Sequence, residues 1–570
     1  MKRFIVITVF IFLTVLCAKS QVFVDLNAQS GANNGTSWED AYITLDSAII
    51  NTEEGEIWVA AGTYLPSIEI NSVYRPYKAF KIDKKISLYG GFSGFESNLN
   101  QRDISNNRTI LSGDIGTIGN DLDNTPRVVI ITGNNIDSTT VIDGFTIEKA
   151  YYTNGYDYGN GAIYIVCEGN PIIRNCTIME NFGFDGSGIY VRNCNPLIIN
   201  NIITENIAFE GAGIYLADYL ANARIINNRI TNNKCIGGYT HLAGGGIKIE
   251  AYSSPYIYGN LIDSNYAGNY GGGIANESNY SASILNNIIS NNVSGEAGGG
   301  IYIDFSPTQI INNLIINNKS TNGGGIFVNY SPNTNSINNT IVNNSSISGG
   351  NQVAVSEANM YFINTIIYNN PSQTSDPIII SIGRKDWFPK FKFCDINGGI
   401  DGITLNDMTY FDSIWKEDNL SIYPEFVDTV HDNFQLKIQS HCINSGITDT
   451  TGLYIPINDL LDSNRVLYNR IDIGCYEFDS LIYNPTYMNE IFENEFTIYP
   501  NPVTDNFTIL CPDNFLNAEI KIYSFDGKLL VADKILENNK IIEIKQYNAG
   551  MYFLKVNSPS GYIIRKIIKQ

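Results

Sequence analysis

Residues 298–322 read GGGIYIDFSPTQIINNLIINNKSTN, and the chain repeats this pattern from residue 161 to residue 370. In each unit a glycine cluster leads into a strand that begins with isoleucine, and a second strand with paired asparagines follows. The lead isoleucines are spaced by 26, 25, 33, 27, 27 and 25 residues, and they are Ile163, Ile189, Ile214, Ile247, Ile274, Ile301 and Ile326. This spacing indicates a repeat protein with one insertion in its third unit.

Both halves of the unit alternate apolar and polar residues, which is the period of a β-strand with one buried face. Glycine supplies positive-φ corners between strands, and asparagine tolerates the same conformation while its amide can bond to the same amide one coil away. The asparagine pairs are Asn201/Asn206, Asn228/Asn233, Asn260/Asn265, Asn287/Asn292, Asn313/Asn318, Asn339/Asn344 and Asn364/Asn369, and the first unit has Cys176/Asn181. We therefore predict an all-β chain built as a right-handed parallel β-helix. A leucine-rich repeat has a similar period, but its leucine scaffold is missing here.

The 570-residue chain is acidic, with a formal net charge of -21. Its first 20 residues contain three basic side chains and no acid, so their removal would give a mature charge of -24 (-21 minus 3). This charge argues against nucleic acid or an anionic membrane surface as a partner, and it is compatible with bound Ca²⁺.

Residues 1–20 have the features of a signal peptide: a basic start, an apolar run over residues 4–16 and a small-residue exit. We expect cleavage before Gln21. Cys17 would suit a lipoprotein, but Leu16 stands where that signal needs a small residue. No later segment has the roughly 18 unbroken apolar residues of a membrane span, so we expect an exported protein without a transmembrane segment.

The segment after the signal predicts a short helix that covers the open end of the first coil. Ser37 and Asp40 resemble a capping box, and the apolar stripe behind them is Ala41, Leu45, Ala48 and Ile49. Without such a cover, the first coil would expose unpaired strand edges.

Several motifs resemble known families of exported proteins. The GG[AG]I and I-x-x-N halves, such as ITNN at 230–233, resemble the repeats of chlamydial polymorphic outer-membrane proteins, which implies an exposed, adhesin-like role. The order of strands over residues 57–145 is similar to that of the pectate-lyase-like superfamily. HCINSGI (441–447), DLLDSNR (459–465) and DIGCYEF (472–478) resemble the end of the choice-of-anchor Q β-helix domain, which implies that the rod closes there.

The C-terminus resembles the sorting domain of type IX secretion substrates. Its three boxes are IYPNPVTDNFTI (498–509), AEIKIYSFDGKLL (518–530) and AGMYFLKVNSPSGYIIRKIIKQ (549–570). Alternating runs around the FDGK turn independently predict a small antiparallel β-sandwich. The resemblance implies recognition by the type IX machinery and its sorting peptidase. It also implies release from, or anchoring to, the surface of a gram-negative bacterium.

These observations divide the chain into six parts. They are a signal peptide (1–20), an N-terminal cap with irregular coils (21–145), regular β-helix repeats (146–370), C-terminal coils and a cap (371–478), a linker (479–494) and the sorting domain (495–570).

Eight cysteines follow the signal peptide without CxxC spacing, so we do not expect a zinc site. Cys442 and Cys475 bracket one compact terminal segment and are the predicted disulfide. Cys167 and Cys194 could also pair, across neighbouring coils.

Aligning the units on their lead isoleucines predicts an acidic column on the outside of the rod. The position after each lead isoleucine holds Tyr164, Tyr190, Tyr215, Lys248, Ala275, Tyr302 and Phe327, and the position two further along holds Val166, Arg192, Ala217, Glu250, Glu277, Asp304 and Asn329. Glu250, Glu277 and Asp304 would then lie about 5 Å apart on successive coils. The insertion at 234–243 could bring Tyr239 and His241 over this column.

Three functions fit such a surface. Stacked carboxylates could hold calcium, with Tyr215, Tyr239 and Tyr302 as aromatic contacts for a glycan in a binding or adhesion protein. Alternatively, Lys248, Glu250, Glu277 and Asp304 could catalyse cleavage of an acidic polysaccharide, as a lyase with a lysine base or as a glycoside hydrolase with two acids. Third, the column could be a solvated stripe on a purely structural surface rod.

Overall fold

The computed structural model describes residues 21–70, 77–153, 159–217, 220–237, 241–278, 280–369, 373, 376–384, 386–416, 418–467, 470–479, 497–511, 515–524, 528–558 and 561–569. The predicted signal peptide and almost all of the predicted linker lie outside these residues. The chain divides into two compact units, Met1–Glu477 and Phe478–Gln570.

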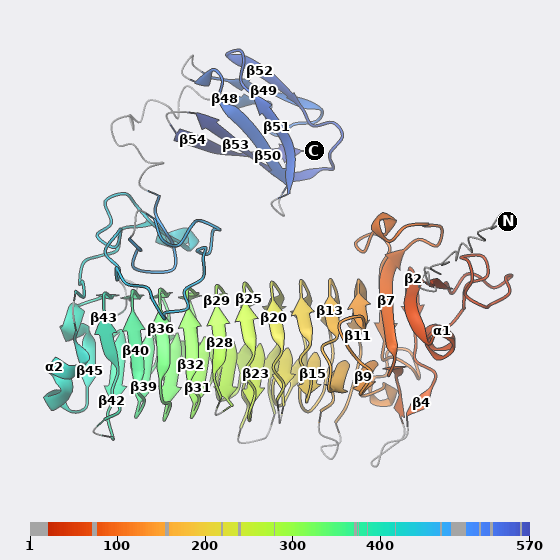
Figure 1. Ribbon diagram of the computed structural model, residues 1–570, viewed down its shortest axis with the longest axis horizontal. Coiled ribbons are helices and arrows are strands. Elements are labelled where there is room, and N and C mark those ends of the chain that lie inside the picture. The colour runs from red at the N-terminus through yellow and green to blue at the C-terminus, as the bar shows by residue number, and fades with distance from the viewer. Residues whose placement is uncertain are drawn as a thin grey trace, which may run out of the picture. The chain divides into compact units, whose positions relative to one another are not determined.

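The first unit is a rod of stacked coils whose strands form parallel sheets along its length (Figure 1). Within the described residues, sheet I comprises β1 (Gln21–Val24), β2 (Glu54–Ala60), β7 (Lys85–Phe92), β10 (Val141–Asp143), β13 (Ile172–Arg174), β16 (Leu197–Ile199), β20 (Arg224–Ile226), β24 (Tyr256–Tyr258), β28 (Ala282–Leu285), β32 (Thr308–Ile311), β36 (Thr334–Ile337), β40 (Met360–Ile363) and β43 (Lys390–Lys392). Each coil places one short strand in this sheet, so neighbouring strands come from consecutive coils.

Two further long sheets close the coil. Sheet II comprises β3 (Gly62–Tyr64), β8 (Thr109–Ser112), β11 (Phe145–Glu148), β14 (Thr177–Met179), β17 (Ile202–Thr204), β21 (Arg229–Thr231), β25 (Leu261–Asp263), β29 (Ile288–Ser290), β33 (Leu314–Ile316), β37 (Thr340–Val342), β41 (Ile366–Tyr368) and β44 (Asp395–Ile396). Sheet III comprises β6 (Phe80–Ile82), β9 (Val129–Gly133), β12 (Ile163–Cys167), β15 (Ile189–Arg192), β19 (Ile214–Leu216), β23 (Ile247–Glu250), β27 (Ile274–Glu277), β31 (Ile301–Asp304), β35 (Ile326–Asn329), β39 (Val353–Ser356), β42 (Ile378–Ser381) and β45 (Ile403–Leu405).

A short fourth sheet bridges sheet II to the glycine clusters. Sheet IV comprises β18 (Ile207–Ala208), β22 (Lys234–Cys235), β26 (Tyr266–Ala267), β30 (Val293–Ser294), β34 (Lys319–Ser320) and β38 (Ser345–Ser346). The remaining short strands of this unit are the antiparallel pairs β4 (Glu69–Ile70) with β5 (Tyr77–Lys78) and β46 (Phe426–Asp428) with β47 (Asn433–Leu436).

Stacked isoleucines fill the rod, as predicted. All seven lead isoleucines are fully buried and belong to one continuous core cluster. The strand register pairs each one with the next, for example Ile247 with Ile274 and Ile274 with Ile301. Burying such a side chain contributes roughly 1.5–3 kcal/mol, so the column is a main source of the rod's stability.

Two asparagine ladders run along the turns, one on each side of sheet II. The Asn287 amide donates to Asn313 Oδ1 at 3.0 Å and to the Ile257 and Leu285 carbonyls, and its own oxygen accepts from Asn260. The left-handed position belongs to the residue before the ladder, such as Asn286 with φ 54°. We expected one asparagine both to adopt the left-handed turn and to form the ladder. Two adjacent asparagines instead take one role each.

This division corrects the last predicted pair, Asn364/Asn369. Asn364 occupies the left-handed turn position, with φ 51°, and Thr365 takes the ladder position beside it. The second ladder ends at Gln352, whose Oε1 accepts from the backbone and side chain of Asn344. The pattern of asparagines alone could not distinguish the turn position from the ladder position.

The helix that covers the first coil begins later than predicted. Helix α1 (Leu45–Asn51) has Thr44 as its N-cap, and the Thr44 hydroxyl accepts from Ser47 N at 3.3 Å. Ser37 instead accepts from Asp40 N within a preceding turn. A second short helix, α2 (Phe411–Ile414), lies at the other end of the rod (Figure 1).

The cysteines pair differently from the main prediction. Cys167 and Cys194 form a disulfide across neighbouring coils, whereas Cys442 and Cys475 are both free and buried. The Cys442 thiol donates to Asp395 Oδ2 at 3.2 Å instead. The predicted bond between Cys442 and Cys475 is therefore wrong.

The second unit is a small antiparallel β domain, as predicted. One sheet contains β48 (Thr497–Tyr499), β49 (Asn506–Leu510) and β52 (Asn539–Glu543), and the other contains β50 (Glu519–Ser524), β51 (Leu529–Lys534), β53 (Gly550–Ser558) and β54 (Gly561–Lys569). Its core includes the buried side chains of Phe507, Ile522 and Leu554. The two sheets thus enclose an apolar core of their own.

Candidate functional site

Sheet III carries a group of charged and aromatic side chains on its outer face, where the sequence predicted an acidic column. We call it the Lys248 cluster, and it comprises Asp185, Glu210, Tyr215, His241, Lys248, Glu250 and Glu277. The register pairs Tyr215 with Lys248 and Glu250 with Glu277, so these four side chains lie together as the repeat alignment predicts.

Lys248 stands at the centre of this cluster with only 1% of its side chain exposed. Its Nζ donates to Glu210 Oε2 and lies 3.4 Å from Glu277 Oε2 and 3.8 Å from Glu250 Oε1. Burial lowers the pKa of Lys248, but the three carboxylates outweigh burial and raise it above its usual value. The side chain is thus held as an ammonium ion, which does not fit the role of a lyase base.

The predicted aromatic contacts are mostly covered. Tyr215 is 5% exposed and its hydroxyl donates to Glu250. Tyr302 is 6% exposed, with its ring stacked between those of Tyr270 and Phe327 at centroid distances of 4.7 and 5.8 Å. Burial raises the pKa of both hydroxyls, so both stay protonated. Neither ring offers a free face to a glycan.

The insertion in the third unit reaches the cluster through His241. Its Nε2 lies 3.0 Å from Glu277 Oε1, and this hydrogen bond raises the pKa of His241. Burial raises the pKa of Glu277, but the bond from His241 and the charge of Lys248 outweigh it and lower the pKa overall. Tyr239, the other predicted residue of the insertion, lies outside the described residues.

The described side chains of the cluster do not converge on a common point where calcium could bind. Among the described side chains, no group of three or more His, Cys, Asp or Glu residues is placed to hold a metal ion. The Lys248 ammonium lies between the carboxylates of Glu250 and Glu277, and Asp304 accepts from Asn329 Nδ2 at 2.9 Å. Glu210, Glu250 and Glu277 thus share the Lys248 ammonium as a cationic partner, and Asp304 has an amide donor.

Sequence reasoning missed two acids of the cluster, Asp185 and Glu210. They stand directly before the glycine clusters of their units and pair with each other across neighbouring coils. Burial and the charge of Glu210 raise the pKa of Asp185 to about 7. Aligning the residue before each glycine cluster, and not only the strands, would have found both.

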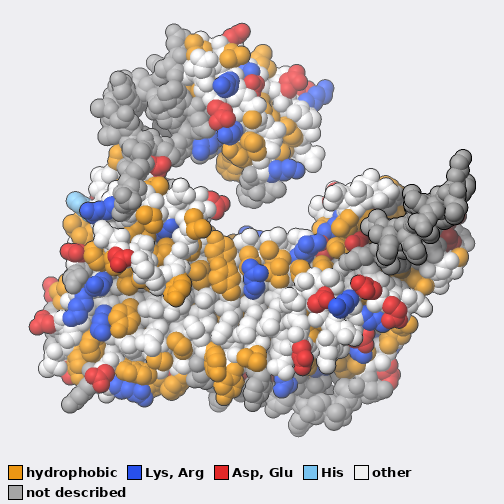
Figure 2. Space-filling view, viewed as in Figure 1, with side chains coloured by type: hydrophobic (Ala, Val, Ile, Leu, Met, Phe, Trp, Pro, Cys, Tyr) orange, Lys and Arg blue, Asp and Glu red, His pale blue; other side chains and the backbone are white. Residues whose placement is uncertain are grey.

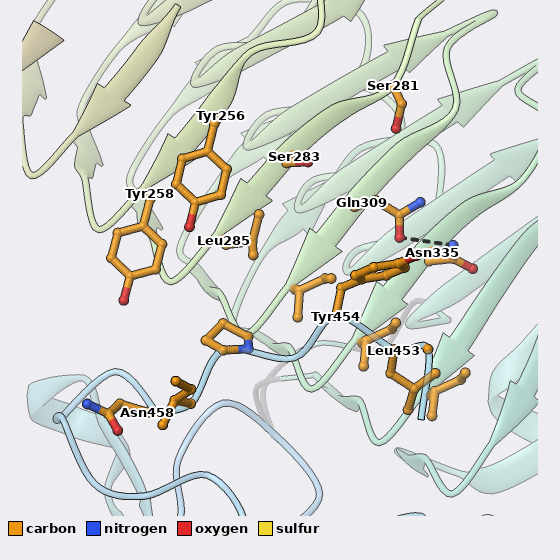
Figure 3. A pocket seen from close by; sticks show the side chains of 16 residues that line it. Tyr256, Tyr258, Ser281, Ser283, Leu285, Gln309, Asn335, Leu453, Tyr454 and Asn458 are labelled. Atoms are coloured by element: carbon orange, nitrogen blue, oxygen red, sulfur yellow. Dashed lines mark hydrogen bonds between the residues drawn. The ribbon is translucent and has the colours of Figure 1, made fainter. Parts of the chain in front are cut away.

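A second feature of the rod is an open groove of about 930 Å³ on the outer face of sheet I (Figure 3). It is lined by Tyr256, Tyr258, Ser281, Ser283, Leu285, Gln309, Ile311, Asn335, Ile337, Ile363, Gly452, Leu453, Tyr454, Pro456, Ile457 and Asn458. None of these lining residues is charged. The side chains instead offer aromatic rings, amides and hydroxyls, which can contact an uncharged polar ligand.

Two columns of strand residues run along sheet I, and only their middle members, from Tyr256 to Asn335 and from Tyr258 to Ile363, form the floor of this groove. The register aligns the first column as Arg224, Tyr256, Ser283, Gln309, Asn335, Tyr361 and Lys390, and the second as Ile226, Tyr258, Leu285, Ile311, Ile337, Ile363 and Lys392. Asn335 Nδ2 donates to Gln309 Oε1 at 3.0 Å, as Figure 3 shows. The Tyr256 and Tyr258 rings lie 5.8 Å apart and nearly parallel.

The loop 452–458 of the C-terminal segment forms the other wall. Leu453 and Ile455 pack on the apolar second column, while Tyr454 is 83% exposed. In Figure 3, Leu453 and Tyr454 extend from this loop toward the sheet. The loop is therefore fixed by its apolar residues and presents a tyrosine to the groove.

Buried polar contacts fix the C-terminal segment that carries this loop. The Asp459 carboxylate accepts from the backbone N–H groups of Leu461, Ser463 and Glu477. Arg465 is fully buried and lies 3.4 Å from Glu477. The sequences DLLDSNR and DIGCYEF thus fold into the support of the groove wall.

Two family models match the chain. The family model described as the right-handed beta helix region matches residues 17–262 and 161–341, which together exceed half of the chain. The chain belongs to the right-handed beta helix family. The model of the secretion system C-terminal sorting domain matches residues 497–570. This match indicates export through the type IX secretion system to the cell surface or the extracellular space.

Two solved structures are similar to this β-helix protein. One is described as the crystal structure of pectate lyase Pel9A, with 14% identity, a TM-score of 0.40, and coverage of 80% of this chain and 96% of that chain. The other is a tailspike protein double mutant of E. coli bacteriophage HK620 in complex with a pentasaccharide, with 11% identity, a TM-score of 0.25, and coverage of 92% and 88%. Similarity at this level carries no argument about function.

No curated protein sequence matches the chain. No helix among its described residues is long and apolar enough to cross a membrane.

Proposed function

We propose that this β-helix protein is an exported glycan-binding or adhesion protein and that the groove on sheet I is its binding site. The observation that carries the proposal is the lining of the groove. Tyr256 and Tyr454 are exposed, and amide and hydroxyl groups stand between them. Aromatic rings stack on the apolar faces of sugars, and amides bond to sugar hydroxyls.

The shape of the groove supports the same function. Its floor continues along successive strands, which lie about 4.8 Å apart. A glycan chain could therefore place one sugar over each strand of the first column, from Tyr256 through Ser283 and Gln309 to Asn335. The rigid β-helix would hold these contacts in position, so little ordering would be needed on binding.

The test is glycan binding by the full chain. A glycan array identifies ligands, and calorimetry then compares Tyr256→Ala with the parent. We expect at least a tenfold loss of affinity, or about 1.4 kcal/mol. Tyr266→Ala is the matched control, because Tyr266 on sheet IV is 37% exposed and Tyr256 is 36% exposed. Absence of glycan binding, or equal loss in both variants, would refute the proposal.

Hydrolysis at the Lys248 cluster is the second candidate. The observation in its favour is that Asp185, with a pKa of about 7, lies near acids whose side chains are partly exposed, such as Glu250. An acid with a raised pKa near a second carboxyl group is the pairing that glycosidases use. Release of reducing ends from polysaccharides, abolished by Glu250→Gln, would support it, and no release from any tested polysaccharide would exclude it.

A further inference from the structure

The neutral groove leads into a second hollow at the end of sheet I. This hollow has a volume of about 520 Å³, and Ile363 lines both. Its other lining residues are Tyr361, Phe362, Phe388, Lys390, Lys392, Ser413 and Lys416. In the strand register Lys390 follows Tyr361 and Lys392 follows Ile363, so both floor columns of the groove end in lysine.

Two of these lysines have positive charges that no described acid neutralises. Lys390 Nζ donates to Tyr361 Oη at 3.4 Å and lies 5.0 and 5.3 Å from the ring centroids of Tyr361 and Phe388. Lys416 Nζ donates to the backbone carbonyl of Asp412 at 3.1 Å. Within the described part of the chain, neither ammonium forms an ion pair with a carboxylate. Both remain able to bind an anion.

This basic hollow contrasts with the acidic character of the protein. The whole chain has a net charge of -21, yet three lysines converge within one small hollow. Figure 2 shows basic side chains gathered over the end of the rod where β43 lies. A local positive field in an acidic protein favours a ligand with a negative group at that point.

We propose that the groove binds a glycan that is neutral along most of its length and carries an anionic group where it enters the basic hollow. The anion is a carboxylate, as in a uronic acid, or a sulfate ester, and Lys390 and Lys416 bind it. This inference rests on the proposed function of the groove. Three strand spacings, about 14 Å, separate Gln309 from Lys390, so the neutral part covers several sugars before the acidic one.

The phenol of Tyr361 and the ring of Phe388 fix the direction in which Lys390 points. An ammonium ion over aromatic faces is held in place electrostatically, so its remaining N–H groups are oriented before the ligand arrives. A lysine binds carboxylate and sulfate as a point charge, without the fork geometry of arginine. The site therefore selects for charge and leaves the type of anion open.

The experiment compares matched pairs of oligosaccharides on the full chain by calorimetry. One pair is xylotetraose with and without a glucuronic acid substituent, and the other is a neutral agaro-oligosaccharide against a sulfated carrageenan oligosaccharide of equal length. We expect the acidic member of at least one pair to bind about tenfold more tightly. Which pair responds shows whether the anion is a carboxylate or a sulfate.

The double variant Lys390→Met/Lys416→Met should remove this preference and leave the affinity for the neutral member unchanged. Lys319→Met is the matched control, because Lys319 is an exposed lysine on β34, outside the groove. The preference should also shrink as salt is added.

The outcomes separate this inference from the proposed function. If both members of each pair bind equally, or if the double variant keeps the preference, the basic hollow is not an anion site, while the groove remains a glycan site. If no oligosaccharide binds to the full chain and the wider glycan array is silent, the proposed function fails and this inference fails with it.

Discussion

Replacing Asn287 with leucine tests the asparagine ladder directly. The Asn287 side chain takes part in five hydrogen bonds: three that its amide donates and two that its oxygen accepts from Asn260. Leucine removes all five. The Asn260 amide keeps two other acceptors and Asn313 Oδ1 keeps the Asn287 backbone donor, but the backbone N–H of Asn260 loses its only acceptor among the described groups.

The expected loss of stability follows from this count. A buried donor without an acceptor costs about 1–3 kcal/mol, and each lost hydrogen bond contributes about 1 kcal/mol net. Because several partners keep a second bond, we expect the free energy of unfolding to fall by about 3–5 kcal/mol. Leucine adds apolar surface to the core, but its side chain has no acceptor atom for the backbone N–H of Asn260.

The assay is urea unfolding of the full chain, followed by circular dichroism. Lys319→Leu is the control, because it introduces the same residue at an exposed position of sheet IV, and we expect a change below about 0.5 kcal/mol. A loss below about 1 kcal/mol for Asn287→Leu would refute the reasoning, since it would mean that the ladder amides are not needed to satisfy the buried backbone.

Three further predictions concern charge, covalent bonding and export. Burial raises the pKa of Asp185 from 3.8 to about 7, so folding favours the protonated acid and the stability of the parent falls as the pH rises from about 4 to 7. In urea unfolding, the stability of Asp185→Asn relative to the parent should therefore increase by up to about 4 kcal/mol between pH 4 and pH 8. A pH-independent difference between the two proteins would contradict this. Cys167 and Cys194 are 27 residues apart in sequence, so reducing the bond between them should cost about 3.5 kcal/mol. Thiol titration of the unfolded, unreduced chain from Gln21 onward should find six free cysteines, and eight would disprove the bond. Deleting residues 496–570 should trap the protein in the periplasm by cell fractionation, and normal surface display would contradict the sorting role.

The repeat made the rod predictable because each coil obeys the same local rule. The lead isoleucines and the glycine clusters recur at fixed offsets, so one unit determines the register of the next. The same regularity predicts that Lys248 lies beside Glu250 and Glu277, and the structure places them together. The prediction was wrong at Asn364, because this asparagine occupies the left-handed turn position, one residue before the ladder position of Thr365.

The groove could not be predicted in the same way. Its floor comes from residues 256–363, and its second wall comes from the loop 452–458, about a hundred residues later. No local pattern relates Tyr454 to Gln309, because their proximity depends on how the C-terminal segment folds back along the rod. The floor columns were nevertheless visible in the sequence as a succession of Tyr, Ser, Gln and Asn at the repeat spacing.

The two outer faces of the rod show why charge alone is a poor guide to a site. On sheet III the acids surround a buried lysine and a histidine, so the protein itself supplies their cationic partners. At the end of sheet I the opposite holds, since Lys390 and Lys416 lie in an open hollow without a described acid to pair with. A ligand gains binding energy only from groups that the fold leaves unsatisfied. The acidic column is conspicuous in the sequence, but its carboxylates have partners in the structure. Lys390 and Lys416 are inconspicuous in the sequence, yet they lie in the hollow that adjoins the groove, without a described acid to pair with. This difference favours the groove and its adjoining hollow as the place where the protein binds its ligand.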